Sequence, residues 1–420
     1  MAKAKNSNGP EAVHSFRFTL KGLILFTLFL VAGTALVSSR LVEAKSKLVS
    51  FQTGDGDAAD KSGQPAHTGA WGELETQDIL LERPFECIAA EDVNPPPELW
   101  NFKGLTPASV RKMLIDAGLT AAEVDAQMSP AHLTITATNL AVLPDESFLL
   151  SLSAEKRRKI YDTFYGLGLG APFDYPMIFS PGTSKAIYAD PRLNPADLAL
   201  LKKLAYPEAN EVRLTDYNLL IRQIPTVERR MTMAKVLTLT PAVLPRLYIH
   251  PNSDIDKIAT YWARIDNVHF NDVRQIMEAL KKLPAGGAVS LTYLLPPFAR
   301  SRLYTFPMPK QPGDPIMDCH WSTFNFDKLQ LDNGFNNPNY TSEYLIKNLY
   351  QIDSPGIFGD VLFFTDGQGI FQHSAVYIAD DLYFNKYGYD SRAPWIITHF
   401  ADIQAMYPKF KPVFYRRRED

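Results

Sequence analysis

The stretch GDVLFFTDGQGIFQHSAVYIADDLYFNKYG, residues 359–388, decides the fold of the C-terminal part of this chain. Three segments rich in β-branched and aromatic residues, 359–364, 373–378 and 382–388, are separated by the turns TDGQG and ADD. Asp-Gly is a strong hairpin signal, and a tight turn reverses the direction of the chain. The stretch therefore predicts three neighbouring antiparallel strands.

Helix and strand patterns flank these three segments. Residues 316–326 predict a short helix, residues 398–407 a capped helix and residues 411–418 a final strand. A helix followed by an antiparallel sheet is an α+β module, here of about 110 residues.

One of only two cysteines stands before the strands, in PIMDCHWSTFNF, residues 315–326. Cys319 lies where the short helix is expected to begin, and a helix N-terminus favours a thiolate and lowers the pKa of a cysteine. His373 opens one strand and Asn385 lies on the next, so the turn between them can bring the two side chains together. A histidine can take the thiol proton and return it, while a side-chain carbonyl orients the imidazole. These three residues are the candidate catalytic site.

Together with Gly359-Asp360 at the start of a strand, these residues resemble the NlpC/P60 superfamily of papain-like cysteine peptidases and amidases. Members have Asp-Cys at a helix start, Gly-Asp opening a strand, a histidine opening the next strand and a polar third residue beyond it. The matching residues here are Asp318-Cys319, Gly359-Asp360, His373 and, twelve residues further on, Asn385. The resemblance covers residues 310–420.

The resemblance implies an envelope cysteine hydrolase that cleaves a peptide-type amide by thiol acyl transfer, with cell-wall peptide as the first substrate to consider. The superfamily commonly has Ser-Gly after the cysteine, where this chain has His320-Trp321. Asp318 and His320 are therefore expected to face the substrate, although His320 could also face solvent.

Other interpretations of Cys319 remain open at this point. It could be an inert core thiol, or form a disulfide with Cys87, the only other cysteine. A zinc site of Cys319, His320 and His373 lacks a fourth ligand and the usual ligand spacing, so neither a metal nor a cofactor is predicted. Two other functions are also kept: a non-catalytic, membrane-anchored envelope scaffold or binding protein, and an NlpC/P60-like acyltransferase.

The N-terminal region carries an uncharged apolar run, residues 22–39, between Lys21 and Arg40. Its length lies between a signal-peptide core and a full membrane span. It predicts an uncleaved N-terminal anchor, with a cleaved signal as the alternative. Either one places residues 41–420 outside the cytoplasm, in the periplasm or on the surface of a bacterial type of cell.

The middle of the chain reads as mostly helical. Thr106-Pro107 and Asn194-Pro195 each put a capping residue before a proline at the first position of a helix. The basic cluster at residues 156–159 predicts a solvated helix face.

The predicted fold class is thus α+β, with an N-terminal membrane helix, a mainly helical middle domain and a C-terminal papain-like NlpC/P60 domain of helix plus antiparallel sheet. The expected domains are a tail with anchor or signal, a flexible linker, the helical domain and the catalytic domain, at residues 1–45, 46–77, 78–300 and 301–420.

The composition of the chain limits the classes of binding partner to be expected. A formal net charge of −3 offers no global electrostatic case for nucleic-acid binding. The expected partners are a peptide or cell-wall substrate and, through the N-terminal helix, the membrane. The sequence does not predict an oligomeric state.

Overall fold

The computed structural model divides the chain into two compact units, Met1–Lys61 and Ser62–Asp420. Every residue that the structure describes belongs to the second unit. The described residues are 67–136, 139–167, 169, 172–173, 176–208, 211–265, 270–308 and 314–418.

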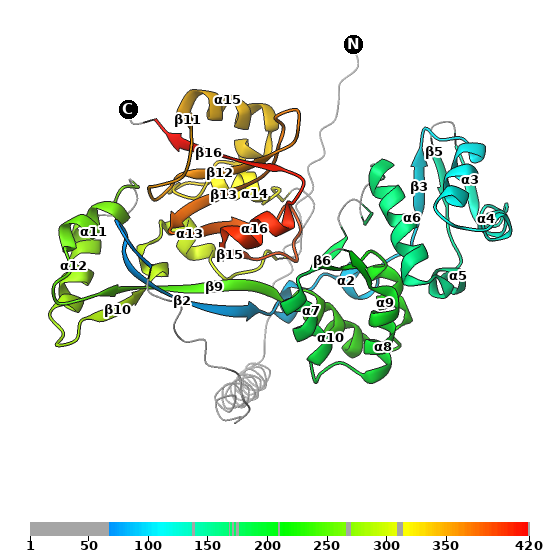
Figure 1. The fold of residues 1–420 in the computed structure, drawn as a ribbon, viewed down its shortest axis with the longest axis horizontal. Coiled ribbons are helices and arrows are strands. Elements are labelled where there is room, and N and C mark those ends of the chain that lie inside the picture. Colours follow the sequence, from blue (N-terminus) through cyan, green and yellow to red (C-terminus); the bar gives the residue numbers. More distant parts are fainter. Residues whose placement is uncertain are drawn as a thin grey trace, which may run out of the picture. The chain divides into compact units, whose positions relative to one another are not determined.

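The C-terminal part of the chain forms a six-stranded antiparallel sheet (Figure 1). β12, β13 and β14 are neighbours in it, as predicted from residues 359–388, and this prediction is confirmed. The strand order is β11 (Leu349–Ile352), β16 (Lys411–Arg417), β12 (Val361–Thr365), β13 (Phe371–Ala379), β14 (Leu382–Lys386) and β15 (Trp395–His399).

Both faces of this sheet are covered, which explains why its central strands are apolar on both sides. α14 (Cys319–Phe324) packs on the face that carries Val376 and Phe384. α16 (Phe400–Met406) packs on the opposite face, which carries Phe364. The predicted helices and strands occur in the predicted order, but the structure adds elements that were not predicted: η3 (Asn333–Asn336), α15 (Pro338–Asn348), β11 and β15.

A second sheet is built around two long strands, β2 (Gly72–Leu81) and β9 (Thr240–Ile249). They pair antiparallel from Glu73–Tyr248 to Leu81–Thr240, and β1 (His67–Gly69) and β10 (Gly287–Ser290) extend the sheet. Because the end of β2 is the direct partner of the start of β9, residues 82–239 are an insertion between the two strands of a β-hairpin.

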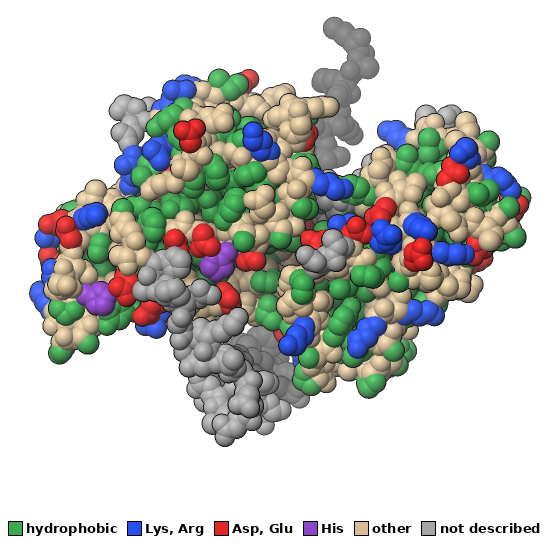
Figure 2. Space-filling view, in the orientation of Figure 1, with side chains coloured by type: hydrophobic (Ala, Val, Ile, Leu, Met, Phe, Trp, Pro, Cys, Tyr) green, Lys and Arg blue, Asp and Glu red, His purple; other side chains and the backbone are tan. Residues whose placement is uncertain are grey.

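This insertion lobe, residues 82–239, has its own hydrophobic core, which includes Trp100 and Phe164. Figure 2 shows acidic and basic side chains interspersed over the lobe on the face in view. Two three-stranded sheets lie in it, of β3 (Trp100–Lys103), β5 (Asn139–Val142) and β4 (Leu133–Ile135), and of β6 (Met177–Phe179), β8 (Glu211–Leu214) and β7 (Tyr206–Glu208). Its helices are η1 (Phe85–Cys87), α2 (Ala90–Val93), α3 (Pro107–Asp116), α4 (Ala121–Gln127), α5 (Glu146–Ser151), α6 (Ala154–Leu167), α7 (Pro181–Ala189), α8 (Pro195–Leu204), α9 (Tyr217–Gln223) and α10 (Val227–Leu237).

The two predicted helix starts in this lobe are confirmed. Thr106 Oγ1 accepts the Ser109 N–H at 3.2 Å before α3, and Asn194 Oδ1 accepts the Ala196 N–H at 3.0 Å before α8. In each case a proline follows at the first helical position, where its missing N–H costs no hydrogen bond.

The predicted helical domain of residues 78–300 and its boundary at 301 are corrected by the structure. Trp262 of α11 and Phe298 of α13 belong to the same apolar core as Trp321 and Phe384 of the C-terminal sheet. The hydroxyl of Tyr261 also donates to the carbonyl oxygen of Ile378 at 2.7 Å. The composition change near residue 300 marks a change of secondary structure and does not mark the end of a core. The elements concerned are α11 (Ile255–Trp262), α12 (Phe270–Lys281), η2 (Leu291–Leu294) and α13 (Pro297–Arg302).

The predicted fold class is also corrected in its N-terminal membrane helix. Residues 22–39 lie outside the described residues, and no helix within the described ranges is long and apolar enough to cross a bilayer. The longest of them, α6, has 14 residues, whereas a span needs about 20. The location outside the cytoplasm stays a prediction.

Candidate functional site

Cys319 is the first residue of α14, and local hydrogen bonds explain why the helix begins there. Asp318 Oδ1 accepts the Trp321 N–H at 2.7 Å, which is an N-cap. The Ser322 hydroxyl donates to the Asp318 carbonyl oxygen at 2.6 Å. The Asp-Cys pair therefore forms the start of the helix, as expected.

The thiol lies against β13 near the point where β13 leaves β14. The ladder between these strands runs from Ala379–Leu382 to Val376–Phe384 and includes neither His373 nor Asn385. Outside this ladder, the backbone N–H of Ser374 donates to the Cys319 sulfur. The nucleophile candidate thus contacts the residue that directly follows His373.

His373 and Asn385 are brought together from neighbouring strands. Asn385 Oδ1 lies 2.8 Å from His373 Nε2, and both side chains are almost fully buried. An amide oxygen can only accept, so Nε2 carries the proton and Nδ1 is the basic nitrogen. Among the described residues His373 Nδ1 has no hydrogen-bond partner. That leaves this nitrogen available to accept a proton.

Aromatic rings enclose the imidazole. Tyr407 stacks on His373 at 4.3 Å between ring centroids and 16° between planes, and Tyr387 stands 6.0 Å away at 18°. Burial in this environment, with a smaller contribution from His320, lowers the pKa of His373 to about 3. Neutral imidazole is therefore the form present at physiological pH.

Burial also determines the direction in which the pKa of the Cys319 thiol is shifted. It raises the pKa of Cys319 to about 12, and Asp318 adds to this, while the Ser374 N–H and Lys386 act in the opposite direction. The expectation of a thiol pKa lowered by the helix N-terminus is thus wrong. α14 has only six residues, and removing a thiolate from water outweighs what so short a helix supplies.

The structure does not join all three predicted site residues. His373 and Asn385 are hydrogen-bonded, whereas no hydrogen bond links Cys319 to His373 within the described chain. Both cysteines are free thiols, and Cys87 lies with its sulfur 3.8 Å from that of Met308, which removes the disulfide interpretation.

The side chains of Asp318 and His320 make contacts within the protein, and their predicted position facing a substrate stays a prediction. The Asp318 carboxylate is used as the helix cap. His320 Nδ1 lies 2.9 Å from Ser374 Oγ, and its ring also hydrogen-bonds the carbonyl of Phe371. These contacts attach α14 to β13, and Ser374 Oγ extends them to Thr323 Oγ1 at 3.0 Å.

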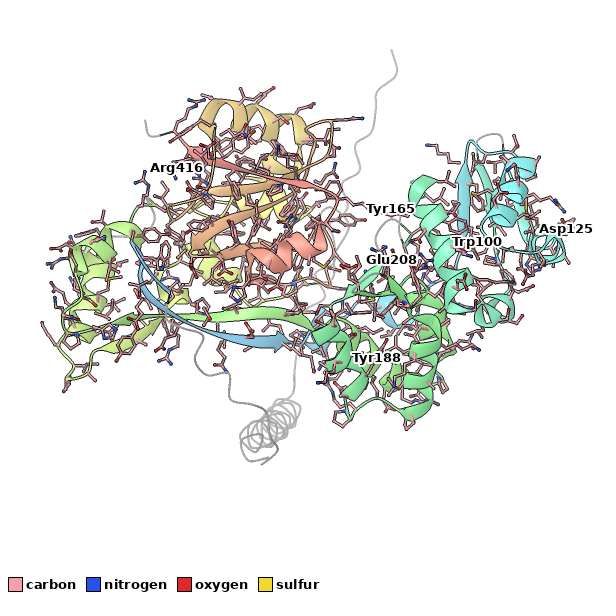
Figure 3. The ribbon with its side chains drawn as sticks, in the orientation of Figure 1. Trp100, Asp125, Tyr165, Tyr188, Glu208 and Arg416 are labelled. Carbon is pink, nitrogen blue, oxygen red and sulfur yellow. The ribbon has the colours of Figure 1, made fainter. Side chains whose placement is uncertain are left out.

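Asp360, at the start of β12, has a structural role. Its carboxylate accepts the backbone N–H groups of Gly356 and Ile357 and two hydrogen bonds of 2.8 Å from Arg416 on β16 (labelled in Figure 3). The Gly-Asp pair thus ties the turn before β12 to a neighbouring strand.

Sequence reasoning missed three residues near the site: Tyr387, Lys386 and Tyr407. Lys386 had a usable signal, since it follows Asn385 directly on a strand otherwise apolar. Tyr407 had none, because only the packing of the chain after α16 places it on His373.

Comparison with known proteins adds nothing to these observations. No protein-family model, no curated protein and no solved structure matches this chain. The resemblance to NlpC/P60 enzymes therefore rests on the residues alone and stays a prediction.

The buried imidazole predicts a specific pH dependence of stability. Unfolded histidine has a pKa near 6.5. Below that pH, His373 therefore binds a proton in the unfolded state but not in the folded state. The free energy of unfolding should then fall by about 1.4 kcal/mol per pH unit from this group as pH drops toward 4. His373→Gln should remove this slope in urea titrations at pH 6.5, 5.5 and 4.5.

The matched control is His132→Gln, in a partly exposed position of the insertion lobe. Equal acid sensitivity of the wild type and the His373→Gln variant would contradict the prediction.

Proposed function

We propose that this protein is a cysteine hydrolase that cleaves a peptide-type amide, with Cys319 as nucleophile, His373 as base and Asn385 as the orienting residue. One observation carries the proposal. His373 donates through Nε2 to Asn385 and keeps Nδ1 without a partner, while the next backbone N–H contacts the Cys319 sulfur. In this arrangement the imidazole has the tautomer that a thiol needs as proton acceptor.

The proposed reaction has two halves. His373 pairs with Phe364 on the face of the sheet that α16 covers, whereas α14 carries Cys319 on the other face. The proposed reaction therefore requires the end of β13 to turn the imidazole toward the thiol. The Cys319 proton then moves to His373 Nδ1 as the sulfur attacks the amide carbon, and the carbonyl oxygen becomes an oxyanion. The C–N bond breaks, the amine leaves with the proton from His373, and a thioester remains. His373 then takes a proton from water, which attacks the thioester and releases the acid and the Cys319 thiol.

Burial affects the protonation states of Cys319 and His373 in this reaction. It disfavours both thiolate and imidazolium, so the resting pair is neutral and the proton moves only as the sulfur attacks. Because Cys319 is only 4% exposed, a substrate has to displace covering side chains before the reaction. Cell-wall peptide is the first substrate to test, because the resemblance to NlpC/P60 enzymes implies it. An acyl acceptor other than water would make the same site an acyltransferase.

A non-catalytic scaffold is the second candidate, and the burial of Cys319 favours it. In a scaffold the thiol would be a small apolar core residue, and its raised pKa would have no consequence. Reactivity in the folded protein separates the two candidates.

The test uses residues 62–420 with Cys87→Ala, so that Cys319 is the only thiol. We expect release of amine from cell-wall stem peptides, loss of that activity in Cys319→Ser and a reduction of at least about 100-fold in His373→Gln. Asn385→Ala should cost less, and Asn385→Gln less again, because an orienting residue does not itself take the proton. His132→Gln, far from the site in sequence, is the matched control.

Two results would decide against the hydrolase. One is cleavage by His373→Gln at the wild-type rate. The other is the absence of cleavage together with a Cys319 thiol that an electrophilic probe labels only after unfolding, which would support the scaffold.

A further inference from the structure

We propose that the buried ammonium group of Lys386 is the cation that stabilises negative charge on the Cys319 sulfur. The inference deepens the proposed function and rests on it for the identity of the reacting sulfur. Lys386 does not contact the scissile bond in this proposal. It acts through Cys319 and is therefore a positioning residue.

Side-chain alternation along β14 places Lys386 on the same face of the sheet as α14. Phe384 belongs to the apolar core that α14 covers, and Lys386 stands two residues further along the same strand. Side chains alternate along β14, so Lys386 points away from the face of Asn385 and toward α14. Ser374, whose N–H contacts the Cys319 sulfur, also hydrogen-bonds His320 and Thr323 of α14 through its hydroxyl.

The lysine is held rigidly in this position. It is 1% exposed, and Nζ donates to the carbonyl oxygens of Gly388 at 3.1 Å and Asp390 at 2.9 Å. Nζ also lies 5.6 Å from the centre of the Trp395 ring, whose indole N–H donates to Ser322 of α14 at 2.8 Å. Burying an ammonium group is costly, and a neutral side chain could occupy a purely structural position at lower cost.

The charges around the site determine the direction in which the pKa of Cys319 changes when the charge of Lys386 is removed. The positive charge of Lys386 lowers the pKa of both Cys319 and His373. The other charged or titratable groups close by are Asp318 and His320 on α14 and Asp390 in the loop after β14, which Arg392 holds through its guanidinium. Loss of the lysine charge therefore raises the pKa of the thiol. Looser packing would do the opposite, because it would let water reach the sulfur.

The experiment measures the rate of Cys319 alkylation by iodoacetamide in residues 62–420 with Cys87→Ala, from pH 8 to 10. Lys386→Met should slow alkylation roughly three- to tenfold at every pH, as expected for a thiol pKa raised by about 0.5–1. Lys386→Arg should restore most of the rate. Lys386→Gln, which keeps a donor for the two carbonyls without the charge, is the second neutral variant in case the methionine variant does not fold.

The matched control is Lys328→Met. Lys328 Nζ also lies over an aromatic ring, that of Tyr344 at 5.4 Å, but Lys328 is not among the groups that influence Cys319. This variant should leave the alkylation rate unchanged. An unchanged or faster rate in folded neutral variants of Lys386 would overturn the inference.

Failure of this inference is distinguishable from failure of the proposed function, because alkylation needs no turnover. Slower alkylation in the neutral Lys386 variants, without any amide cleavage by the wild type, would support the role of Lys386 and contradict the proposed hydrolase. Amide cleavage by the wild type, with unchanged alkylation in the neutral Lys386 variants, would support the hydrolase and contradict the role of Lys386.

Discussion

Replacing residues 82–239 by Asn-Gly is expected to leave a folded protein, in which β2 and β9 form a simple hairpin. Leu81 and Thr240 are cross-strand partners, and a two-residue Asn-Gly turn joins such ends with the twist that antiparallel strands prefer. The insertion lobe has a separate hydrophobic core, so its removal takes no residue from the core of the remaining unit.

Among the described residues, contacts between the lobe and the remaining unit include the 3.8 Å approach of the Cys87 and Met308 sulfur atoms and two cation–π contacts. Arg392 lies over the Tyr217 ring at 5.5 Å, and Lys409 over that of Tyr165 (labelled in Figure 3) at 4.0 Å. Such cation–π contacts contribute about 0.5–2 kcal/mol each. The shortened chain should therefore unfold cooperatively in a urea titration followed by near-ultraviolet circular dichroism.

The matched comparison is the fragment 301–420, which corresponds to the domain predicted from sequence. It keeps the six-stranded sheet and α14 but loses Trp262 and Phe298 from the shared core. Losing a single buried aromatic side chain costs about 3–5 kcal/mol, which is comparable to the whole stability of a small domain. We expect this fragment to show no cooperative transition. A folded fragment 301–420 beside an unfolded shortened chain would refute the proposed architecture.

The second large effect is expected at Arg157, in the insertion lobe. Arg157 and Asp216 form an ion pair with both side chains fully buried. The same aspartate accepts a hydrogen bond from Tyr161, and the guanidinium donates to the Leu149 carbonyl at 2.7 Å. Arg157→Met leaves the Asp216 charge buried without its cation, which should lower the free energy of unfolding by about 3–5 kcal/mol.

Two further variants make this prediction specific. Arg158→Met is the matched control, because Arg158 is 40% exposed and its ion pairs are weak, so it should cost less than about 1 kcal/mol. The double variant Arg157→Met with Asp216→Leu removes both charges and should recover much of the loss. Urea titrations give the three free energies, and equal values for Arg157→Met and Arg158→Met would contradict a buried pair.

Arg157 also shows why the prediction of a solvated basic helix face was wrong at one position. It lies three, four and seven residues before Ile160, Tyr161 and Phe164, which are buried on α6. Arg157 is therefore on the apolar stripe of the helix. The periodicity was visible in the sequence, but its buried partner, Asp216, lies in a distant segment.

Local signals determined much of this protein. Turn residues and apolar segments in residues 359–388 determined three neighbouring strands, and the capping residues Thr106 and Asn194 determined two helix starts. The tight turn between β13 and β14 also brought His373 and Asn385 together. Each of these features depends on residues close in sequence, where chain geometry leaves few alternatives.

The tertiary structure alone decided the pairing of β2 with β9, the core shared across residue 300 and the burial of the thiol. β2 and β9 are separated by the whole insertion lobe, and such distant pairing leaves no local pattern. Likewise, the pKa of Cys319 depends on how completely α14 and the sheet exclude water. Solvent exclusion is a property of the assembled core, so the sequence placed the candidate nucleophile and only the fold decided its ionisation.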